Sequence, residues 1–212
     1  MTRPVKESDD FPVAARDPDR TRQDLLIAAE REMHLHGYQA ASLSHIIAEA
    51  GVTKGALYHH FANKQALGYA VVDELWGPHL RRMWIEPLND SANDPVDTLI
   101  DMVEQAGAAL GDDELMLGCP INNLAQEMSP INEGFRNRIN QLLAEWREQI
   151  AVSLARGIVL GQVSEQVQPQ AAAAMLVAAL EGCIGIAKNA QSRELLMQCG
   201  AGVIDYLKTL KA

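Results

Sequence analysis

The 212-residue sequence predicts an all-α protein of about nine helices, and two observations lead to that prediction. Apolar residues recur at spacings of three and four along almost the whole chain from Asp19 onward, which is the period of an amphipathic helix. No segment alternates apolar and polar residues as a strand does, and no Asn-Gly hairpin turn is present. Because 48% of the residues are hydrophobic and 22% are charged, we expect a globular chain with a substantial core.

The first third of the chain predicts a flexible arm followed by three helices. Residues 1–18 mix charge, proline and small residues without a period, which is typical of a flexible terminus. Gly37 and Gly51 each follow an apolar stripe, and glycine is the residue that most often ends a helix. The three expected helices cover residues 19–36, 44–50 and 54–60.

The remainder predicts six further helices. Asn63 is placed as the N-cap of a helix that starts at Lys64. Gly77-Pro78 should kink or end this helix, since proline lacks the N–H donor and clashes with the preceding turn. The other five expected helices cover residues 95–110, 120–128, 139–158, 169–189 and 193–210.

The composition limits the classes of protein to which this chain could belong. The N-terminus lacks the apolar core of a secretory signal, and the richest apolar run, Ala171 to Leu180, ends at Glu181 and is too short to span a bilayer. Three scattered cysteines exclude a disulfide framework. We therefore expect a cytoplasmic protein with reduced thiols and no membrane partner.

The charge is unevenly distributed. The net charge is −10, yet residues 1–65 carry 8 Lys and Arg against 9 Asp and Glu, whereas residues 66–212 carry 10 against 19. Five of the six histidines also lie in the first third. A polyanionic partner such as DNA would therefore have to meet the first third of the chain.

The most informative segment is residues 42–64, in which two short helices are joined by the turn Gly51-Val52-Thr53. A helix-turn-helix of this kind places the N-terminal end of its second helix in the major groove of DNA. Thr53 is placed to cap that helix, and Lys54 could reach a guanine edge or a phosphate. The alternative is a packed helical hairpin with an ordinary solvated face. The other residues that suit a groove-binding helix are Gly55, Ala56, Tyr58, His59 and, at the start of the next helix, Lys64.

The stretch Thr21–Trp76 resembles the DNA-binding domain of TetR-type (tetracycline-repressor family) transcriptional regulators. The resemblance covers about a quarter of the chain closely, and the later helices match that family in length and architecture only. It is carried by Leu26-xx-Ala29, Gly37-Tyr38, Ser42-Leu43, Ile46, the run Gly51-Val52-Thr53-Lys54-Gly55-Ala56-Leu57-Tyr58-His59-His60-Phe61, and Asn63-Lys64-xx-Leu67.

The resemblance implies a three-helix DNA-binding domain over residues 19–65 and a helical ligand-binding and dimerisation domain over residues 66–212. It implies a homodimeric repressor that binds a palindromic double-stranded DNA operator and is released when a small-molecule inducer engages the C-terminal domain. Ser44 and His45 stand where relatives often carry a longer basic residue followed by an acidic one. Carried over by position, Ser42, Thr53, Tyr58 and Lys64 would contact phosphates, Lys54, Gly55, Ala56 and His59 would lie nearest the bases, and Ser44 is a further candidate contact.

Two functions are expected of the C-terminal domain. The helices at 169–189 and 193–210 combine small residues with apolar stripes, so they could pair with a second copy in a four-helix bundle, or only complete the monomer core. Large adaptable side chains could line a ligand pocket, although packing in the core is the better explanation for any one of them. The candidate ligand residues are Trp84, Met102, Cys119, Asn123 and Trp146.

Cys119 carries the most specific hypothesis. It lies between Gly118 and Pro120, and proline favours the first position of a helix, so Cys119 should be the N-cap. The positive end of the helix dipole would lower the pKa of the thiol, and an electrophile could then act on it as the inducer. The alternative is an inert, buried cysteine.

An enzyme is not expected. The histidine pairs at 34 and 36 and at 59 and 60 lack the i,i+4 spacing with which a helix holds a metal, and no nucleophile or phosphate-loop motif is present. We predict no cofactor. A helical adaptor that has lost DNA binding is the remaining alternative, and the retained Lys54, Tyr58 and Lys64 argue against it.

Overall fold

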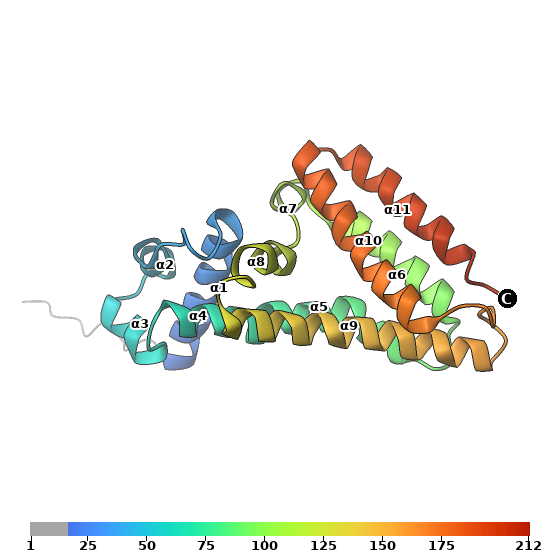
Figure 1. Ribbon diagram of the computed structural model, residues 1–212. Coiled ribbons are helices and arrows are strands. Elements are labelled where there is room, and N and C mark those ends of the chain that lie inside the picture. The colour runs from blue at the N-terminus through green and yellow to red at the C-terminus, as the bar shows by residue number, and fades with distance from the viewer. Residues whose placement is uncertain (1–16) are drawn as a thin grey trace, which may run out of the picture.

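The computed structural model describes residues 17–212 and confirms the all-α prediction, since these residues form helices joined by short loops without a strand among them (Figure 1). Most of the predicted arm, residues 1–16, lies outside the described residues. Its last two residues belong to the first helix. Asp17 is the N-cap and accepts the N–H of Asp19 at 3.1 Å, and Pro18 occupies the first helical position.

The N-terminal helices begin and end at the residues that the sequence indicates. Ser42, Thr53 and Asn63 each cap a helix through the side-chain oxygen. Gly37 and Gly51 follow helices with φ of 79° and 62°, a backbone conformation that glycine adopts without strain. The helices are α1 (Pro18–His36), α2 (Leu43–Ala50), α3 (Lys54–His60) and α4 (Lys64–Val71).

The expected break at Gly77-Pro78 takes the form of a shift in hydrogen bonding. Helix α4 passes through a π-helical segment, Val72–Trp76, into α5 (Gly77–Trp84). The N–H of Gly77 donates to the carbonyl of Val72, five residues back, and Pro78 follows without a donor of its own. The chain therefore continues as a helix past the proline, with its register changed.

The structure contains all the C-terminal helices that were predicted, although α9 begins at Glu133 and not at residue 139, and it adds two helices, α5 and α7. Helix α5 was not predicted because Gly77-Pro78 was expected to kink or end the helix that starts at Lys64, and α7 was not predicted because it has only six residues. A 3₁₀ segment, Glu86–Asn89, follows α5. The remaining helices are α6 (Pro95–Ala109), α7 (Asp112–Leu117), α8 (Pro120–Met128), α9 (Glu133–Val159), α10 (Pro169–Ala190) and α11 (Arg193–Lys208).

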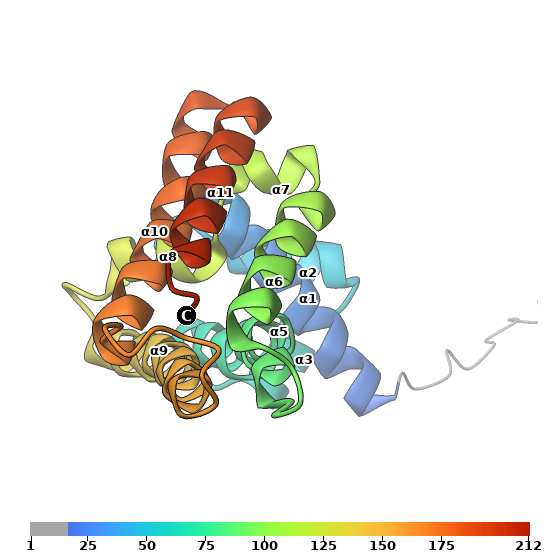
Figure 2. The same ribbon diagram turned by 90° about the vertical axis from the view of Figure 1, so that its right-hand side faces the viewer.

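The molecule is elongated, with α2 and α3 at one end and α6, α10 and α11 at the other (Figures 1 and 2). Helix α9 runs between the two ends and contributes Phe135 and Trp146, which are 0% and 2% exposed. One continuous apolar core extends from Leu25 on α1 to Leu207 on α11. The helix-turn-helix end is therefore packed directly onto the rest of the chain.

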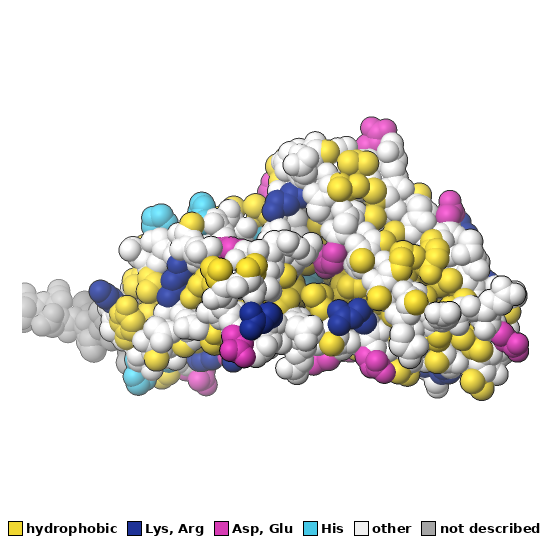
Figure 3. All heavy atoms as spheres, in the orientation of Figure 1, with side chains coloured by type: hydrophobic (Ala, Val, Ile, Leu, Met, Phe, Trp, Pro, Cys, Tyr) yellow, Lys and Arg dark blue, Asp and Glu magenta, His cyan; other side chains and the backbone are white. Residues whose placement is uncertain are grey.

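Helix α10 corrects one expectation. It has 22 residues and is long and apolar enough to cross a bilayer by length and composition, whereas the run Ala171 to Leu180 had suggested too short a segment. Only 33% of its most apolar window is buried. Met175 and Ile186 are exposed apolar side chains of this helix, and hydrophobic side chains are seen over α10 in Figure 3.

Candidate nucleic-acid interface

The turn between α2 and α3 has the geometry of a tight helix-turn-helix. Gly51 ends α2 in the left-handed conformation, and the N–H of Val52 donates to the carbonyl of Ile47 at 3.1 Å. The Oγ1 atom of Thr53 then accepts the N–H of Ala56 at 3.1 Å and starts α3. These two caps fix the angle between the helices.

Helix α3 separates an apolar face from a polar one. Leu57 and Phe61 point into the core, with exposed fractions of 0% and 3%. On the other face Lys54 and Tyr58 are exposed, and the Nζ atom of Lys54 lies 5.9 Å from the centre of the Tyr58 ring. His59 is exposed on the same helix. The helix is thus anchored by two buried side chains and offers hydrogen-bond donors to a partner.

Gly55 is not required by packing within the chain. Its φ is not positive, and a Cβ atom added to it would meet only the Oγ1 of Thr53, at 3.7 Å. The open space beside Gly55 leaves room for another molecule to approach the backbone of α3.

The start of α2 is held by a carboxylate that our sequence analysis did not identify. Glu32 on α1 is 6% exposed, and its Oε1 atom accepts the N–H of Ser42 at 2.8 Å and lies 3.4 Å from Nδ1 of His45. Ser42 caps α2 by accepting the N–H of His45 at 3.4 Å, and Ser44 is exposed beside it. A signal was present in the sequence: Glu32 follows Leu25 by seven residues and so shares its buried helical face.

Lys64 is already engaged within the chain. Its Nζ atom donates to the carbonyl of Gln39 at 3.0 Å and lies 5.0 Å from the centre of the Tyr38 ring. Burial lowers the pKa of this ammonium group. The predicted phosphate-contact residue therefore also links the start of α4 to the loop after α1.

The candidate ligand residues do not converge on one pocket. Met102 lines a groove of about 750 Å³ between α5 and α6, and Asn123 lines a separate cavity of about 440 Å³ between α1 and α8. Trp84 and Trp146 pack against each other with ring centres 5.1 Å apart, and the indole N–H of Trp146 has no hydrogen-bond partner in the described structure. Neither tryptophan lines either of these cavities.

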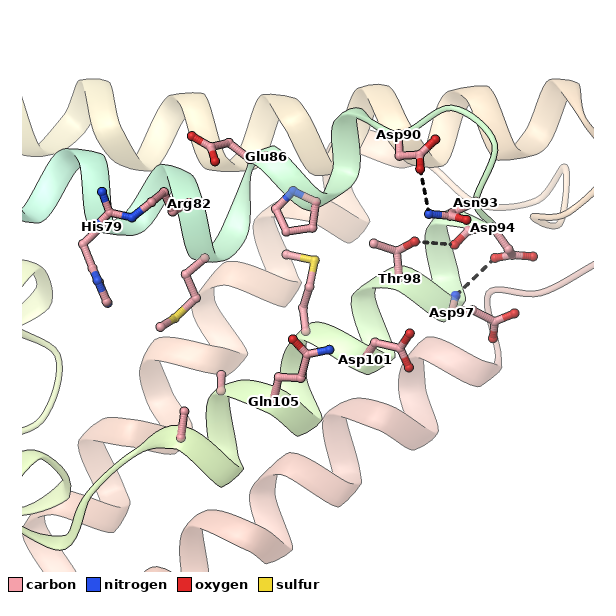
Figure 4. A pocket seen from close by; sticks show the side chains of 15 residues that line it. His79, Arg82, Glu86, Asp90, Asn93, Asp94, Asp97, Thr98, Asp101 and Gln105 are labelled. Carbon is pink, nitrogen blue, oxygen red and sulfur yellow. Dashed lines mark hydrogen bonds between the residues drawn. The ribbon is translucent and has the colours of Figure 1, made fainter.

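Most of the charged side chains that line the α5–α6 groove are acidic, and the aspartates gather toward one end of it (Figure 4). Three of its carboxylates have structural roles, because Asp94 caps α6, Asp90 accepts the side-chain N–H of Asn93 at 3.1 Å and Asp97 pairs with Lys211. Arg82 and His79 line the end of the groove nearer the helix-turn-helix (Figure 4). The acidic residues that line it are Glu86, Asp90, Asp94, Asp97 and Asp101.

Cys119 occupies the predicted position, but the predicted lowering of its pKa is wrong. Its sulfur accepts the N–H of Asn122 at 3.5 Å, as an N-cap does. Burial raises the pKa of the Cys119 thiol far above its usual range, and the carboxylate of Glu181, 3.4 Å from the sulfur, raises it further. The two effects outweigh the helix terminus, so the thiol remains protonated at neutral pH.

The other two cysteines lie together on the last two helices. Cys183 on α10 shares a hydrogen bond with Cys199 on α11, and burial raises the pKa of Cys183 to about 11. In the described structure all three cysteines are free thiols.

Known proteins match this arrangement over both parts of the chain. Residues 25–71 match the family described as bacterial regulatory proteins, tetR family, and residues 95–201 match transcriptional regulator LmrA/YxaF-like, C-terminal domain. The HTH-type transcriptional repressor DhaR of a Mycobacterium species is 29% identical over 177 residues, which cover 84% of this chain and 87% of that protein. An uncharacterized HTH-type transcriptional regulator of Lactococcus lactis subsp. lactis is 27% identical over 192 residues, covering 89% and 92%.

A solved structure has the same fold. A TetR transcriptional regulator from Chloroflexus aurantiacus superposes with a TM-score of 0.79 and is 25% identical, covering 93% of this chain and 98% of its own. All three of these proteins are transcriptional regulators.

Proposed function

Because this chain belongs to the TetR family of DNA-binding transcriptional regulators, we propose that it is a repressor that binds a palindromic operator as a homodimer. One observation carries the proposal: α3 is anchored by buried Leu57 and presents Lys54 and Tyr58 to solvent beside a glycine that packing does not require. We assign DNA binding to residues 19–65 and ligand binding with dimerisation to residues 66–212.

The contacts follow from the position of each residue on the hairpin. Lys54, in the first turn of α3, is placed to meet a base edge or a phosphate in the major groove. The caps at the starts of α2, α3 and α4 direct free backbone N–H groups outward, where a phosphate would be favoured. The proposed phosphate contacts are Ser42, Thr53, Tyr58 and Lys64, and the residues proposed nearest the bases are Ser44, Lys54, Gly55, Ala56 and His59.

The apolar surface of α10 supports a homodimer through α10 and α11. Met175 and Ile186 on α10 and Met197 on α11 are 38%, 50% and 56% exposed. Added Cβ atoms at Gly182 and Gly185 would meet nothing within 4 Å, so another backbone has room to approach there. Two such helices from each subunit would form a four-helix bundle.

We propose that a small molecule bound in the C-terminal domain favours a second arrangement of the dimer and releases the operator. The α5–α6 groove is large enough for such a ligand. The raised pKa of Cys119 gives no support to an electrophile acting at that thiol. We place the repressor in the cytoplasm, where its operator lies.

The test is a fluorescence anisotropy titration on DNA from upstream of the protein's own gene, repeated at several salt concentrations. A repressor that neutralises phosphates should bind a specific fragment tightly and lose affinity steeply as salt rises, because counterions are released from the DNA. A control fragment of the same length and scrambled sequence should bind much more weakly. Equal, salt-insensitive binding of both fragments would instead favour the alternative of a helical adaptor protein that has lost specific DNA binding.

A further inference from the structure

Glu127, near the end of α8, holds the loop that precedes the helix-turn-helix. Its Oε2 atom accepts the N–H of Tyr38 at 2.8 Å, and its Oε1 atom accepts the N–H of Gln39 at 2.7 Å. Two successive backbone donors thus share one carboxylate, and hydrogen bonds to a charged acceptor are stronger than neutral ones. The bond partners are 89 and 88 residues apart in the chain.

The sequence leaves room for this carboxylate. Gly37 has φ of 79°, and an added Cβ atom would lie 3.0 Å from Oε2 of Glu127. Any other residue at position 37 would therefore be strained in its backbone and would also crowd the carboxylate. The close approach of α8 to the loop is built into both segments.

The same loop is also held from its other side. The Tyr38 ring packs edge-on against Phe135 of α9, with centres 4.6 Å apart, and Lys64 donates to the carbonyl of Gln39. Gly68 on α4 lies so close to both rings that an added Cβ would be 2.8 Å from Tyr38. The loop is therefore fixed between α4, α8 and α9.

The opposite end of α8 is bonded to α10. The Oδ1 atom of Asn123 accepts from Nζ of Lys188 at 2.9 Å, and the thiol of Cys119 donates to Glu181 at 3.4 Å. Helix α8 has nine residues and is therefore about 14 Å long at 1.5 Å per residue. It connects α10 directly to the loop that Glu127 holds, and it lies between these parts in Figure 1.

We infer that Glu127 is a positioning residue for DNA binding: it fixes the helix-turn-helix relative to α10, and so sets the distance between the two α3 helices of a dimer. The inference rests on the proposed function, since it assumes a dimer formed through α10 and α11. In that dimer, the half-site spacing of the operator must match the distance between the two α3 helices.

The test compares operators whose centres are lengthened or shortened by one base pair. Wild-type protein should prefer the native spacing at least about tenfold, because a rigid pair of recognition helices penalises each wrong spacing. Glu127→Gln keeps the shape of the side chain but turns a donor toward one of the two loop N–H groups. This variant should bind the native operator about three- to tenfold more weakly and discriminate between spacings less than about threefold.

Gln126→Ala, at the neighbouring position on α8, is the matched control and should keep the wild-type spacing preference. Hydrogen exchange should show faster exchange of the Tyr38 and Gln39 amides in Glu127→Gln only. If that variant does not fold, Glu127→Asp keeps the charge but shortens the reach and should loosen the spacing in the same direction. A loss of folded protein alone would weaken binding to every operator equally.

The outcomes separate the inference from the function on which it rests. A wild-type protein that does not bind DNA, or binds without spacing preference, overturns the proposed dimeric repressor and this inference with it. A wild-type preference that Glu127→Gln and Glu127→Asp both retain in full overturns the role of Glu127 alone.

Discussion

Helices α3 and α8 begin alike, yet their N-termini lie in opposite surroundings. In each, the N-cap side chain accepts the N–H of the residue three positions on, at 3.1 Å for Thr53 and 3.5 Å for Cys119. The first turn of α3 is exposed, with Lys54 and Gly55 at the surface. The start of α8 is packed against α10, and Glu181 lies beside the cap.

The difference shows that a capping pattern predicts a cap but not the chemistry of the residue that forms it. A helix N-terminus favours a negative charge by less than about 1 kcal/mol in most exposed settings. Desolvation and one neighbouring carboxylate exceed that amount at Cys119, so the pKa of the thiol moves upward. At α3 nothing comparable opposes an anionic partner, so we propose function there and not at Cys119.

The largest effect should come from removing the two donors on α3. Lys54→Ala combined with Tyr58→Ala should lower operator affinity at least about a hundredfold, because both side chains are exposed and would contact DNA. Circular dichroism and gel filtration should show an unchanged, folded dimer. Arg82→Ala on α5 makes the same change in charge as Lys54→Ala and should leave the affinity within about twofold. Unchanged affinity in the double variant would contradict the assignment of α3 as the recognition helix.

The next largest effect concerns the start of α8 and the reactivity of the Cys119 thiol. In a variant with Cys183→Ser and Cys199→Ser, alkylation of Cys119 by iodoacetamide at pH 7 should be at least about tenfold slower than that of N-acetylcysteine. The reason is that the thiolate is the reactive form, and the raised pKa leaves little of it. The rate, followed by intact-mass spectrometry, should increase steadily up to pH 10. An alkylation rate equal to that of N-acetylcysteine would contradict the raised pKa and would support Cys119 as a reactive, sensing thiol.

The caps of this fold are predictable from the sequence because they depend on neighbours in the chain. Thr53, Asn63 and Cys119 each bond to the residue three positions on, and Gly51 ends a helix through its own backbone. Helix α5 was missed because Gly77-Pro78 was expected to kink or end the preceding helix, and α7 was missed because its six residues span less than two turns.

The carboxylates that organise the site could not be found in the same way. Glu127 and Glu181 act on partners 89 and 62 residues away, so only the folded chain brings them together. The same holds for Trp84 and Trp146, which were candidates for a pocket and pack against each other. A local pattern cannot distinguish a side chain that lines a cavity from one that fills a core.

A smaller effect should separate DNA binding from stability at Gly55. Gly55→Leu should weaken operator binding about tenfold, because the larger side chain keeps the backbone of α3 away from the bases. The melting temperature should stay the same or rise, since leucine favours a helix and the added Cβ atom would make only an ordinary contact, 3.7 Å from the Oγ1 atom of Thr53. Gly55→Ala adds only this Cβ atom and should weaken operator binding less than Gly55→Leu does. A melting temperature that falls together with the affinity would mean that Gly55 serves the fold.

The smallest effect concerns Glu181, which makes the start of α8 unlike that of α3. Burial raises the pKa of this carboxyl, and its Oε2 atom is buried without a hydrogen-bond partner in the described structure. Because the pKa of Glu181 is higher in the folded chain than in the unfolded chain, the protonated carboxyl stabilises the folded state. This stabilisation is complete at pH values below the pKa of the unfolded chain and is lost as the pH rises through the pKa of the folded chain. As the pH rises above the raised pKa of Glu181, the wild type comes to carry a buried charge that Glu181→Gln does not. The variant should be more stable by about 1 kcal/mol in urea unfolding at pH 8, at a fixed protein concentration, and the gain should shrink at pH 4.5.

Glu86→Gln, at an exposed carboxylate, should show no comparable gain at pH 8. A gain of the same size at both pH values would mean that packing, and not the charge of Glu181, distinguishes the two helix termini.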